Sequence, residues 1–110
     1  MGEVEPLLAF LRAQAPNLMV MASVCTGSYW LARAGLLEGR EATTHSLRLA
    51  DFAEKFPAVR VMGEKIVDRG RIITAGGVSS GIDLGLHLLE RFHGPEARRR
   101  EAIRLDGPWS

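Results

Sequence analysis

Apolar residues alternate along the chain between helical spacing and continuous runs, which is the pattern of an α/β protein. Segment 6–15 places leucines at helical intervals behind Pro6, and the apolar run 18–24 is typical of a strand buried on both faces of a parallel sheet. Segment 26–37 returns to helical spacing. The chain therefore opens in the order helix, strand, helix, with Cys25 at the last junction.

The remaining residues continue this alternation. We expect a short β-prone piece at 42–44 and a helix over 47–56. Three strands follow, at 59–62, 65–67 and 71–75, and then two helices, over 82–92 and 96–105. The strands 59–62 and 65–67 flank Gly63 and Glu64 and are expected to form a hairpin or edge pair, and segment 68–70 a turn. The alternation predicts an α/β fold with helices on both faces of a mainly parallel sheet.

The glycine-rich segment 76–81 resembles a phosphate-binding loop only in composition. No Lys-Ser or Lys-Thr pair follows it, and the G-x-G-x-x-G spacing is absent. We therefore expect a tight strand-to-helix turn, with Ser79 or Ser80 as the N-cap.

Composition narrows the class of protein. The 110 residues are 46% hydrophobic and 25% charged, with a net charge of +1, which suits one globular domain, complete or partial, over 1–110. This balance disfavours binding of nucleic acid or a membrane surface through bulk charge, and a small molecule fits better. One cysteine excludes an intrachain disulfide, and Glu3 and Glu5 stand where a signal peptide would be basic. These two features predict a cytoplasmic protein. No apolar run approaches the roughly 18 residues of a membrane span, which argues against a transmembrane protein.

Segment 23–27, with the sequence S-V-C-T-G, has the layout of a nucleophile elbow. Cys25 stands between small residues two positions away on either side, which such a sharp turn requires because those side chains approach each other. The N-terminus of the following helix favours a thiolate, and the N–H of Thr26 would point where an oxyanion could be held. The alternative is a small buried hydrophobic residue at a strand end, since free cysteine is among the most buried residue types.

Two stretches, SVCTGSYWLARAGLLEGREATTH (23–45) and GRIITAGGVSSGIDLGLHLLERFHG (70–94), resemble the ThiJ/PfpI family of the class I glutamine amidotransferase-like superfamily. That family includes isocyanide hydratases, deglycase-like proteins and ligand domains of some transcription regulators. The resemblance implies a three-layer flavodoxin-like sandwich, with Cys25 reactive, Thr26 positioning substrate or water, and His45 of the A-T-T-H segment near the cysteine. It also implies a homodimer and a packing role for 77–83.

The sequence departs from the family pattern in two places. Ser46 follows His45, where the hydratase-like branch commonly has a large aromatic residue. The family domain also begins with strands and a helix that precede Leu7 and carry the acidic partner of the cysteine, and neither Glu3 nor Glu5 aligns with that residue. We therefore expect either a domain truncated at its N-terminus or a shortened relative without the acid.

Other chemistry-bearing residues have structural explanations. His45 could act on the thiolate or could cap the next helix. His87 follows Asp83 by four residues and is expected to form a surface pair, His93 ends a helix, and segment 98–100 is a solvated basic face. One cysteine and three scattered histidines offer no close ligand pair, so we expect no metal or other cofactor.

The resulting hypothesis is a cysteine-dependent hydratase or hydrolase of the isocyanide hydratase type, acting on a small electrophile. Cys25 would attack carbon, the Thr26 N–H would stabilise the developing charge, and His45 would assist a proton or water step. One alternative is a non-catalytic ligand-binding or redox-sensing module in which Cys25 is an oxidisable thiol. Another is an inactive fragment, whose uncovered sheet edge and apolar face would pair with another copy or with a missing segment.

Overall fold

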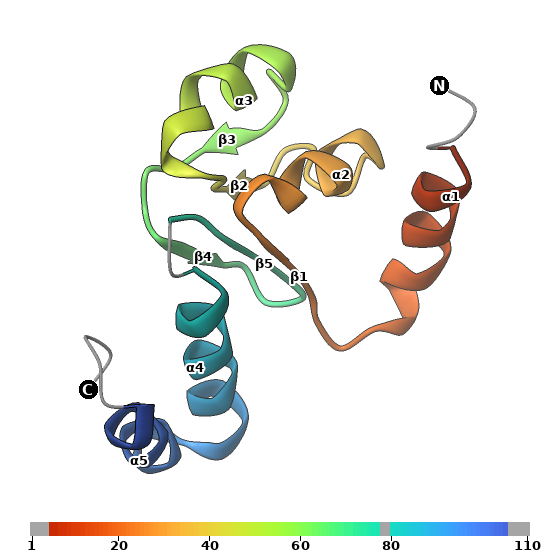
Figure 1. Ribbon diagram of the computed structural model, residues 1–110. Helices are drawn as coiled ribbons and strands as arrows, with labels where there is room; N and C mark the ends of the chain where they lie inside the picture. Colours follow the sequence, from red (N-terminus) through yellow and green to blue (C-terminus); the bar gives the residue numbers. More distant parts are fainter. Residues whose placement is uncertain (1–4, 78–79, 106–110) are drawn as a thin grey trace.

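The computed structural model describes residues 5–77 and 80–105. Figure 1 shows the arrangement of the elements, which are α1 (Glu5–Gln14), β1 (Met21–Val24), α2 (Ser28–Arg33), β2 (Glu41–Ala42), α3 (Leu49–Lys55), β3 (Arg60–Val61), β4 (Ile66–Asp68), β5 (Ile72–Ala75), α4 (Ser80–His93) and α5 (Pro95–Leu105). Short 3₁₀ turns occupy Ala15–Asn17, Cys25–Gly27 and Ser46–Arg48. Among the described residues, no helix has the length and apolar character needed to cross a membrane.

Parallel pairing predominates, as the sequence predicts. The larger sheet has the order β1-β5-β4, in which β1 and β5 are parallel and β4 is antiparallel to β5. A second sheet joins β2 and β3 in parallel. Because β1 and β5 are far apart in sequence, their pairing brings the elbow segment beside the loop that follows β5.

The hairpin expected between 59–62 and 65–67 is wrong. β3 pairs with β2, and β4 instead forms a hairpin with β5. The predicted turn at 68–70 closes that hairpin: the Gly70 N–H donates to Oδ1 of Asp68 at 2.9 Å, and Gly70 adopts φ +85°. An Asx turn ending in glycine favours this tight reversal, whereas segment 63–64 links strands of different sheets.

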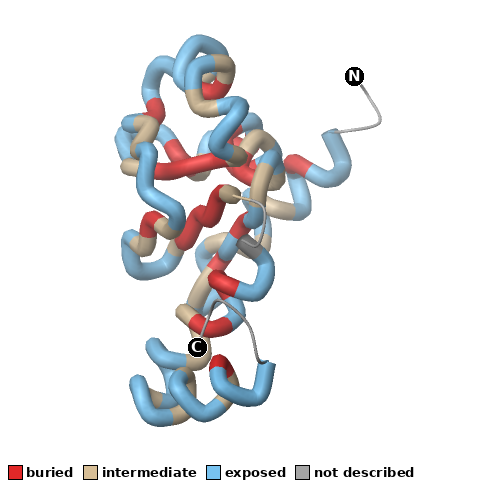
Figure 2. The backbone as a smooth tube through the Cα atoms, turned by 60° about the vertical axis from the view of Figure 1, so that its left-hand side comes forward, coloured by how far each residue is buried: buried red, intermediate tan, exposed pale blue. Residues whose placement is uncertain are grey.

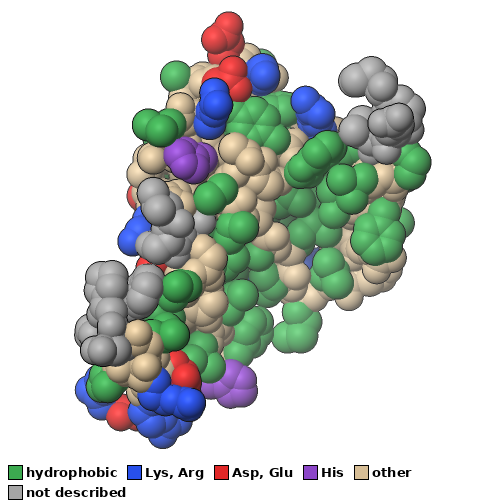
Figure 3. Space-filling model, in the orientation of Figure 1, with side chains coloured by type: hydrophobic (Ala, Val, Ile, Leu, Met, Phe, Trp, Pro, Cys, Tyr) green, Lys and Arg blue, Asp and Glu red, His purple; other side chains and the backbone are tan. Residues whose placement is uncertain are grey.

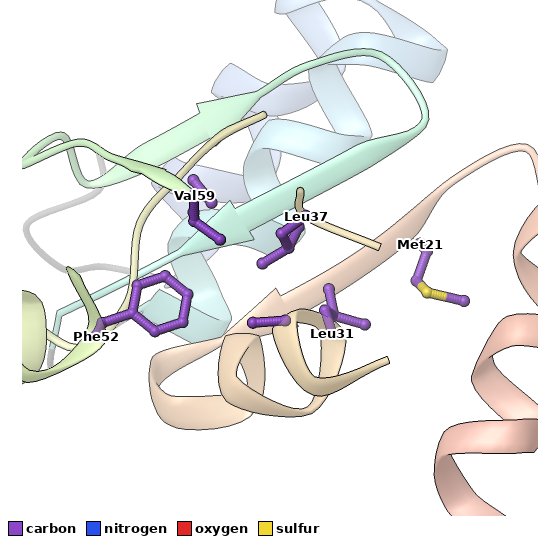
Figure 4. Close-up of a cluster of buried hydrophobic side chains, with 7 residues drawn as sticks. Met21, Leu31, Leu37, Phe52 and Val59 are labelled. Atoms are coloured by element: carbon purple, nitrogen blue, oxygen red, sulfur yellow. The ribbon is translucent and has the colours of Figure 1, made fainter. Parts of the chain in front are cut away.

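Helices cover both faces of the larger sheet, which confirms the predicted layering. Figure 4 shows the cluster on one face, in which Leu31 of α2 lies between Met21 of β1 and Phe52 of α3. On the other face, Ile73 and Ala75 of β5 pack with Leu84 of α4. Ile72 contacts the first cluster, because successive side chains of a strand point to opposite faces. Buried residues gather along the strands in Figure 2, whereas α5 is mostly exposed.

Strand β1 is shorter and less buried than the apolar run 18–24 predicts. Met21 and Ser23 are buried, whereas Ala22 and Val24 are exposed. Because side chains alternate between the two faces of a strand, the exposed pair lies on one face of β1, the outer strand of the described sheet. A continuous apolar run is typical of a strand covered on both faces.

The helix predicted over 26–37 is also shorter. It comprises a 3₁₀ turn and the six residues of α2, followed by turns at Gly35 (φ +82°) and Gly39 (φ +72°). Glycine accepts these left-handed conformations and so ends the helix early. A six-residue helix has few aligned peptide dipoles, so its electrostatic support for a thiolate is weaker than the sequence suggests.

Candidate active site

Cys25 lies at the turn between β1 and α2 with a strained backbone. Its φ is +50°, the one positive φ recorded for a non-glycine residue between 5–77 and 80–105. This left-handed conformation costs an L-residue about 1–2 kcal/mol, so the surrounding packing has to enforce it. The local geometry is therefore the sharp strand-to-helix turn that the S-V-C-T-G pattern predicts.

The small residues on either side of the cysteine do approach each other. A Cβ atom placed on Gly27 would lie 3.6 Å from Cβ of Ser23, which is ordinary van der Waals contact. The turn thus brings positions 23 and 27 together, but it leaves room for an alanine at 27. Ser23 Oγ is buried and has no hydrogen-bond partner among the described residues.

Segments distant in sequence converge on the half-buried cysteine. Its Sγ donates to the carbonyl oxygen of Gly77 at 3.3 Å, across the sheet edge from β5. Its own carbonyl oxygen accepts hydrogen bonds from Thr44 Oγ1 at 3.0 Å and from Ser28 Oγ at 3.4 Å. The A-T-T-H segment and the loop after β5 therefore hold the elbow from two sides.

Gly76 makes this convergence possible. A Cβ atom at this position would lie 2.0 Å from the carbonyl oxygen of Thr44, closer than any real contact. Nearby, Thr74 Oγ1 accepts from the Thr43 N–H at 2.9 Å in a buried hydrogen bond. The end of β5 and the A-T-T-H segment thus pack backbone against backbone. The sequence of 76–81 predicts only a turn, and this close contact of Gly76 is not evident from it.

Thr26 and His45 both belong to the wall of a hollow of about 480 Å³ that Leu47 and Arg48 complete. His45 caps the following 3₁₀ turn, because its Nδ1 accepts from the Leu47 N–H at 3.1 Å. Neutral His45 then carries its proton on Nε2. Capping and chemistry are therefore compatible, since they use different ring nitrogens. Cys25 is not part of this wall, and it adjoins the hollow through Thr26.

A second hollow, of about 330 Å³, shares Thr26 and Arg48 with the first. Side chains of α2 and α3 complete its wall, namely Tyr29, Trp30, Arg33, Asp51 and Lys55. This cluster is not among the site residues predicted from the sequence. The available signal was the spacing of residues 48, 51 and 55, which places them on one helical face.

Tyr29 and Asp51 form the strongest polar contact of this hollow. The tyrosine hydroxyl donates to Oδ2 of Asp51 at 2.6 Å. Burial, the hydrogen bond to Asp51 and that residue's negative charge raise the pKa of Tyr29 to about 12. The hydrogen bond from Tyr29, aided by Lys55 and Arg48, holds the pKa of Asp51 below its ordinary value despite partial burial. At neutral pH the pair is thus a neutral phenol and a carboxylate.

The remaining candidates lie elsewhere. The surface pair expected between His87 and Asp83 is wrong. His87 Nε2 instead contacts Oδ2 of Asp68 at 2.7 Å, and Asp83 pairs with Lys65 at 3.1 Å. His93 ends α4, as predicted. The basic segment of α5 is an exposed face with ion pairs to glutamates. Of the two candidate N-caps, Ser80 is the first residue of α4 and Ser79 lies outside the described residues. Within the described ranges no group of three His, Cys, Asp or Glu could hold a metal ion.

Comparison with known sequences places these features in a family. The sequence model of the DJ-1/PfpI family matches residues 1–91. Isonitrile hydratase of Pseudomonas putida is 36% identical over 104 residues, which cover 94% of this chain and 45% of that protein. The HTH-type transcriptional regulator GbdR of Pseudomonas aeruginosa is 42% identical over 90 residues, covering 81% of this chain and 24% of the regulator. The chain thus spans less than half the length of these relatives.

Solved structures agree. A ThiJ/PfpI family protein from Pseudomonas syringae superposes with a TM-score of 0.82 at 28% identity, over 94% of this chain and 42% of that one. DJ-1beta of Drosophila melanogaster has a TM-score of 0.74 at 22% identity, over 90% of this chain and 52% of its own, which shows the shared fold. The flavodoxin-like α/β architecture is therefore confirmed. The extent of the sequence match, together with this architecture, shows that the chain belongs to the DJ-1/PfpI family.

Proposed function

We propose that this chain carries the cysteine site of a hydratase or hydrolase that acts on a small electrophilic molecule. The observation that carries the proposal is the left-handed backbone of Cys25 at the strand-to-helix turn, beside the hollow shared by Thr26 and His45. Strain of this kind persists where the fold over-determines a residue, which is common at active sites. The 36% identity to an isonitrile hydratase supports the same reaction class.

The proposed chemistry uses the three residues in succession. For an isonitrile, the Cys25 sulfur bonds to the terminal carbon, which also takes up a proton, and a thioimidate forms. Nε2–H of His45, in the wall of the adjoining hollow, is the proposed proton donor. The Thr26 N–H, in the first turn where helical amides lack an internal acceptor, stabilises developing negative charge. Water then adds to the same carbon, the C–S bond breaks, and an N-substituted formamide leaves with the elements of one water added.

Turnover of an alkyl isonitrile tests this proposal. Proton NMR would follow the formyl hydrogen of the product with the full 110-residue chain and with its Cys25→Ser and His45→Gln variants. We expect Cys25→Ser to abolish formamide production and His45→Gln to reduce kcat by about 10²-fold or more. Folded wild-type protein that makes no formamide, and whose thiol reacts no faster than that of the urea-unfolded chain, would overturn the enzyme assignment.

A second candidate is a non-catalytic ligand-binding or redox-sensing module. The 42% identity to a transcriptional regulator favours it. In that case Cys25 would act as an oxidisable thiol, and the hollows would bind a ligand without turning it over. Mass spectrometry after mild peroxide treatment separates the two functions: a sulfinic acid confined to Cys25, with no isonitrile turnover, would support sensing.

We further propose that the chain forms a homodimer. The exposed outer edge of β1 and its exposed apolar residue Val24 are the observations that support it. An unpaired apolar strand is a template for association.

A further inference from the structure

We propose that the second hollow, between α2 and α3, binds the carboxylate group of a small molecule whose reactive carbon lies at Cys25. The proposal rests on the function proposed above and specifies its substrate class. A hollow of about 330 Å³ is at the lower end of the size range of small-molecule sites.

The charges of this hollow are unbalanced. Three cationic side chains, Arg33, Arg48 and Lys55, face one carboxylate, that of Asp51. Asp51 already accepts the Tyr29 hydroxyl and lies 3.6 Å from Lys55 Nζ, so its charge is matched within the wall. Within the described chain neither Arg33 nor Arg48 has an acidic side chain at ion-pair distance, which leaves two guanidinium groups for an anion from solution.

Aromatic rings define the shape of the site. The Arg33 guanidinium lies 5.5 Å from the ring centre of Trp30, and Lys55 Nζ lies 6.0 Å from that of Tyr29. A guanidinium in a cation–π contact retains N–H donors, and two of them match a carboxylate in a two-point hydrogen bond. Lys and Arg side chains border apolar atoms over α2 and α3 in Figure 3. The hollow therefore combines cationic hydrogen-bond donors with two aromatic rings in its wall.

The position of the hollow connects it to the cysteine. Thr26 and Arg48 belong to its wall and also to the wall of the hollow that contains His45. A carboxylate bound at Arg48 would thus place the rest of a short molecule at Thr26, the residue that follows Cys25. Electrophiles with a carboxylate a few bonds from the reactive carbon fit this arrangement.

Two alkylating reagents that differ in one group provide the test. Iodoacetate and iodoacetamide have the same reactive carbon, and each forms a thioether with the single cysteine as the C–I bond breaks, iodide leaves and the thiol proton passes to solvent. The measured quantity is the iodoacetate-to-iodoacetamide rate ratio at Cys25, with the urea-unfolded chain as reference. We expect the folded chain to have a ratio about tenfold higher, the effect of one charge-assisted hydrogen bond.

Charge-matched variants distinguish the site from general attraction. Arg48→Gln and Arg33→Gln should each lower the ratio of the folded chain several-fold, whereas Arg100→Gln on the exposed face of α5 removes the same charge and should leave it unchanged. If one hollow variant does not fold, the other still gives the answer. Equal ratios in folded and unfolded chains, or equal effects of Arg48→Gln and Arg100→Gln, would overturn the proposal.

Failure of the underlying function would produce a different result. If Cys25 is not an activated nucleophile, the iodoacetamide rate itself would be no higher in the folded chain than in the unfolded one. If only the carboxylate site is wrong, iodoacetamide would react faster with the folded chain than with the unfolded one. The iodoacetate-to-iodoacetamide rate ratio would then be the same in both.

Discussion

Gly76 lets the end of β5 pass directly against the backbone of Thr44. An added methyl group would meet the Thr44 carbonyl oxygen at 2.0 Å, and neither backbone can move without disturbing the bond between Thr44 and Cys25. We therefore expect Gly76→Ala to lower the free energy of unfolding by about 3 kcal/mol, in the upper range for overpacking. Urea denaturation followed by tryptophan fluorescence would measure it.

Gly85→Ala is the matched control for this substitution. Gly85 lies inside α4 with open space around its Cα, so the same added methyl group should raise the free energy of unfolding by about 0.5–1 kcal/mol through helix propensity. Equal effects at positions 76 and 85 would contradict the close approach at Gly76.

Tyr29 provides a spectroscopic test of the second hollow, because it is the single tyrosine of the chain. Its pKa is raised to about 12 by burial and by Asp51, so the phenol stays neutral well beyond the ordinary value near 10. Because this pKa is raised in the folded chain, the neutral phenol of Tyr29 contributes to the free energy of unfolding below pH 10. That contribution is lost as the pH rises through about 12. Rapid pH jumps followed by absorbance at 295 nm would give the midpoint.

Substitution of the partner should shift that midpoint in a known direction. Asp51→Asn removes the negative charge beside the phenol and weakens its hydrogen bond, so the pKa of Tyr29 should fall toward the ordinary value. A midpoint near 10 in the folded wild-type chain would contradict the contact between Tyr29 and Asp51.

Asp68 links two elements, because it closes the β4–β5 hairpin and also binds α4. His87 contacts its Oδ2 at 2.7 Å, and Arg91 lies 3.4 Å from its Oδ1. Burial raises the pKa of Asp68, but the hydrogen bonds from His87 and Gly70 and the charge of Arg91 outweigh it, so the net pKa lies below the ordinary value. The folded chain therefore binds this proton less tightly than the unfolded chain does.

Stability should consequently fall as the pH drops below about 4, through the lowered pKa of Asp68. At pH 7 we expect Asp68→Asn to lower the free energy of unfolding by about 1 kcal/mol, and the difference from wild type should vanish in acid. Denaturation curves across pH 2–7 would measure both effects. Glu101→Gln, which alters an exposed ion pair with Arg104, should change stability by a few tenths of a kcal/mol at most.

The elements show why sequence predicts some features and not others. The positions of α1, α4 and the turn at 68–70 follow from local spacing, capping and turn chemistry, and they match the prediction. The pairing of β4 with β5 does not, because strand partners depend on contacts across the chain. The same division applies to the site: the elbow at Cys25 is a local pattern, whereas the hollow between α2 and α3 exists only after the helices pack.

On the scale of the whole molecule, one apolar surface continues across elements distant in sequence. Figure 3 shows hydrophobic side chains spread over α1, β1 and the nearer part of α4. Exposed apolar residues include Phe10 of α1, Val24 of β1 and Ile82 of α4, and Met19, just before β1, is 76% exposed. Contiguous apolar surface of this kind marks an association site.

Association through this surface would cover the exposed edge and apolar side chain of β1. The apolar run that contains β1 is typical of a strand that is covered on both faces. We expect sedimentation velocity to show a concentration-dependent dimer that Val24→Lys weakens at least tenfold in Kd, because a lysine on an edge strand opposes pairing. Ile103→Lys, at an exposed apolar position of α5 away from β1, should leave Kd unchanged.

Because Val24 adjoins Cys25, a dimer formed here would also cover the elbow, so alkylation of Cys25 should slow as protein concentration rises. A monomer at all concentrations, with an alkylation rate independent of concentration, would show that β1 remains uncovered.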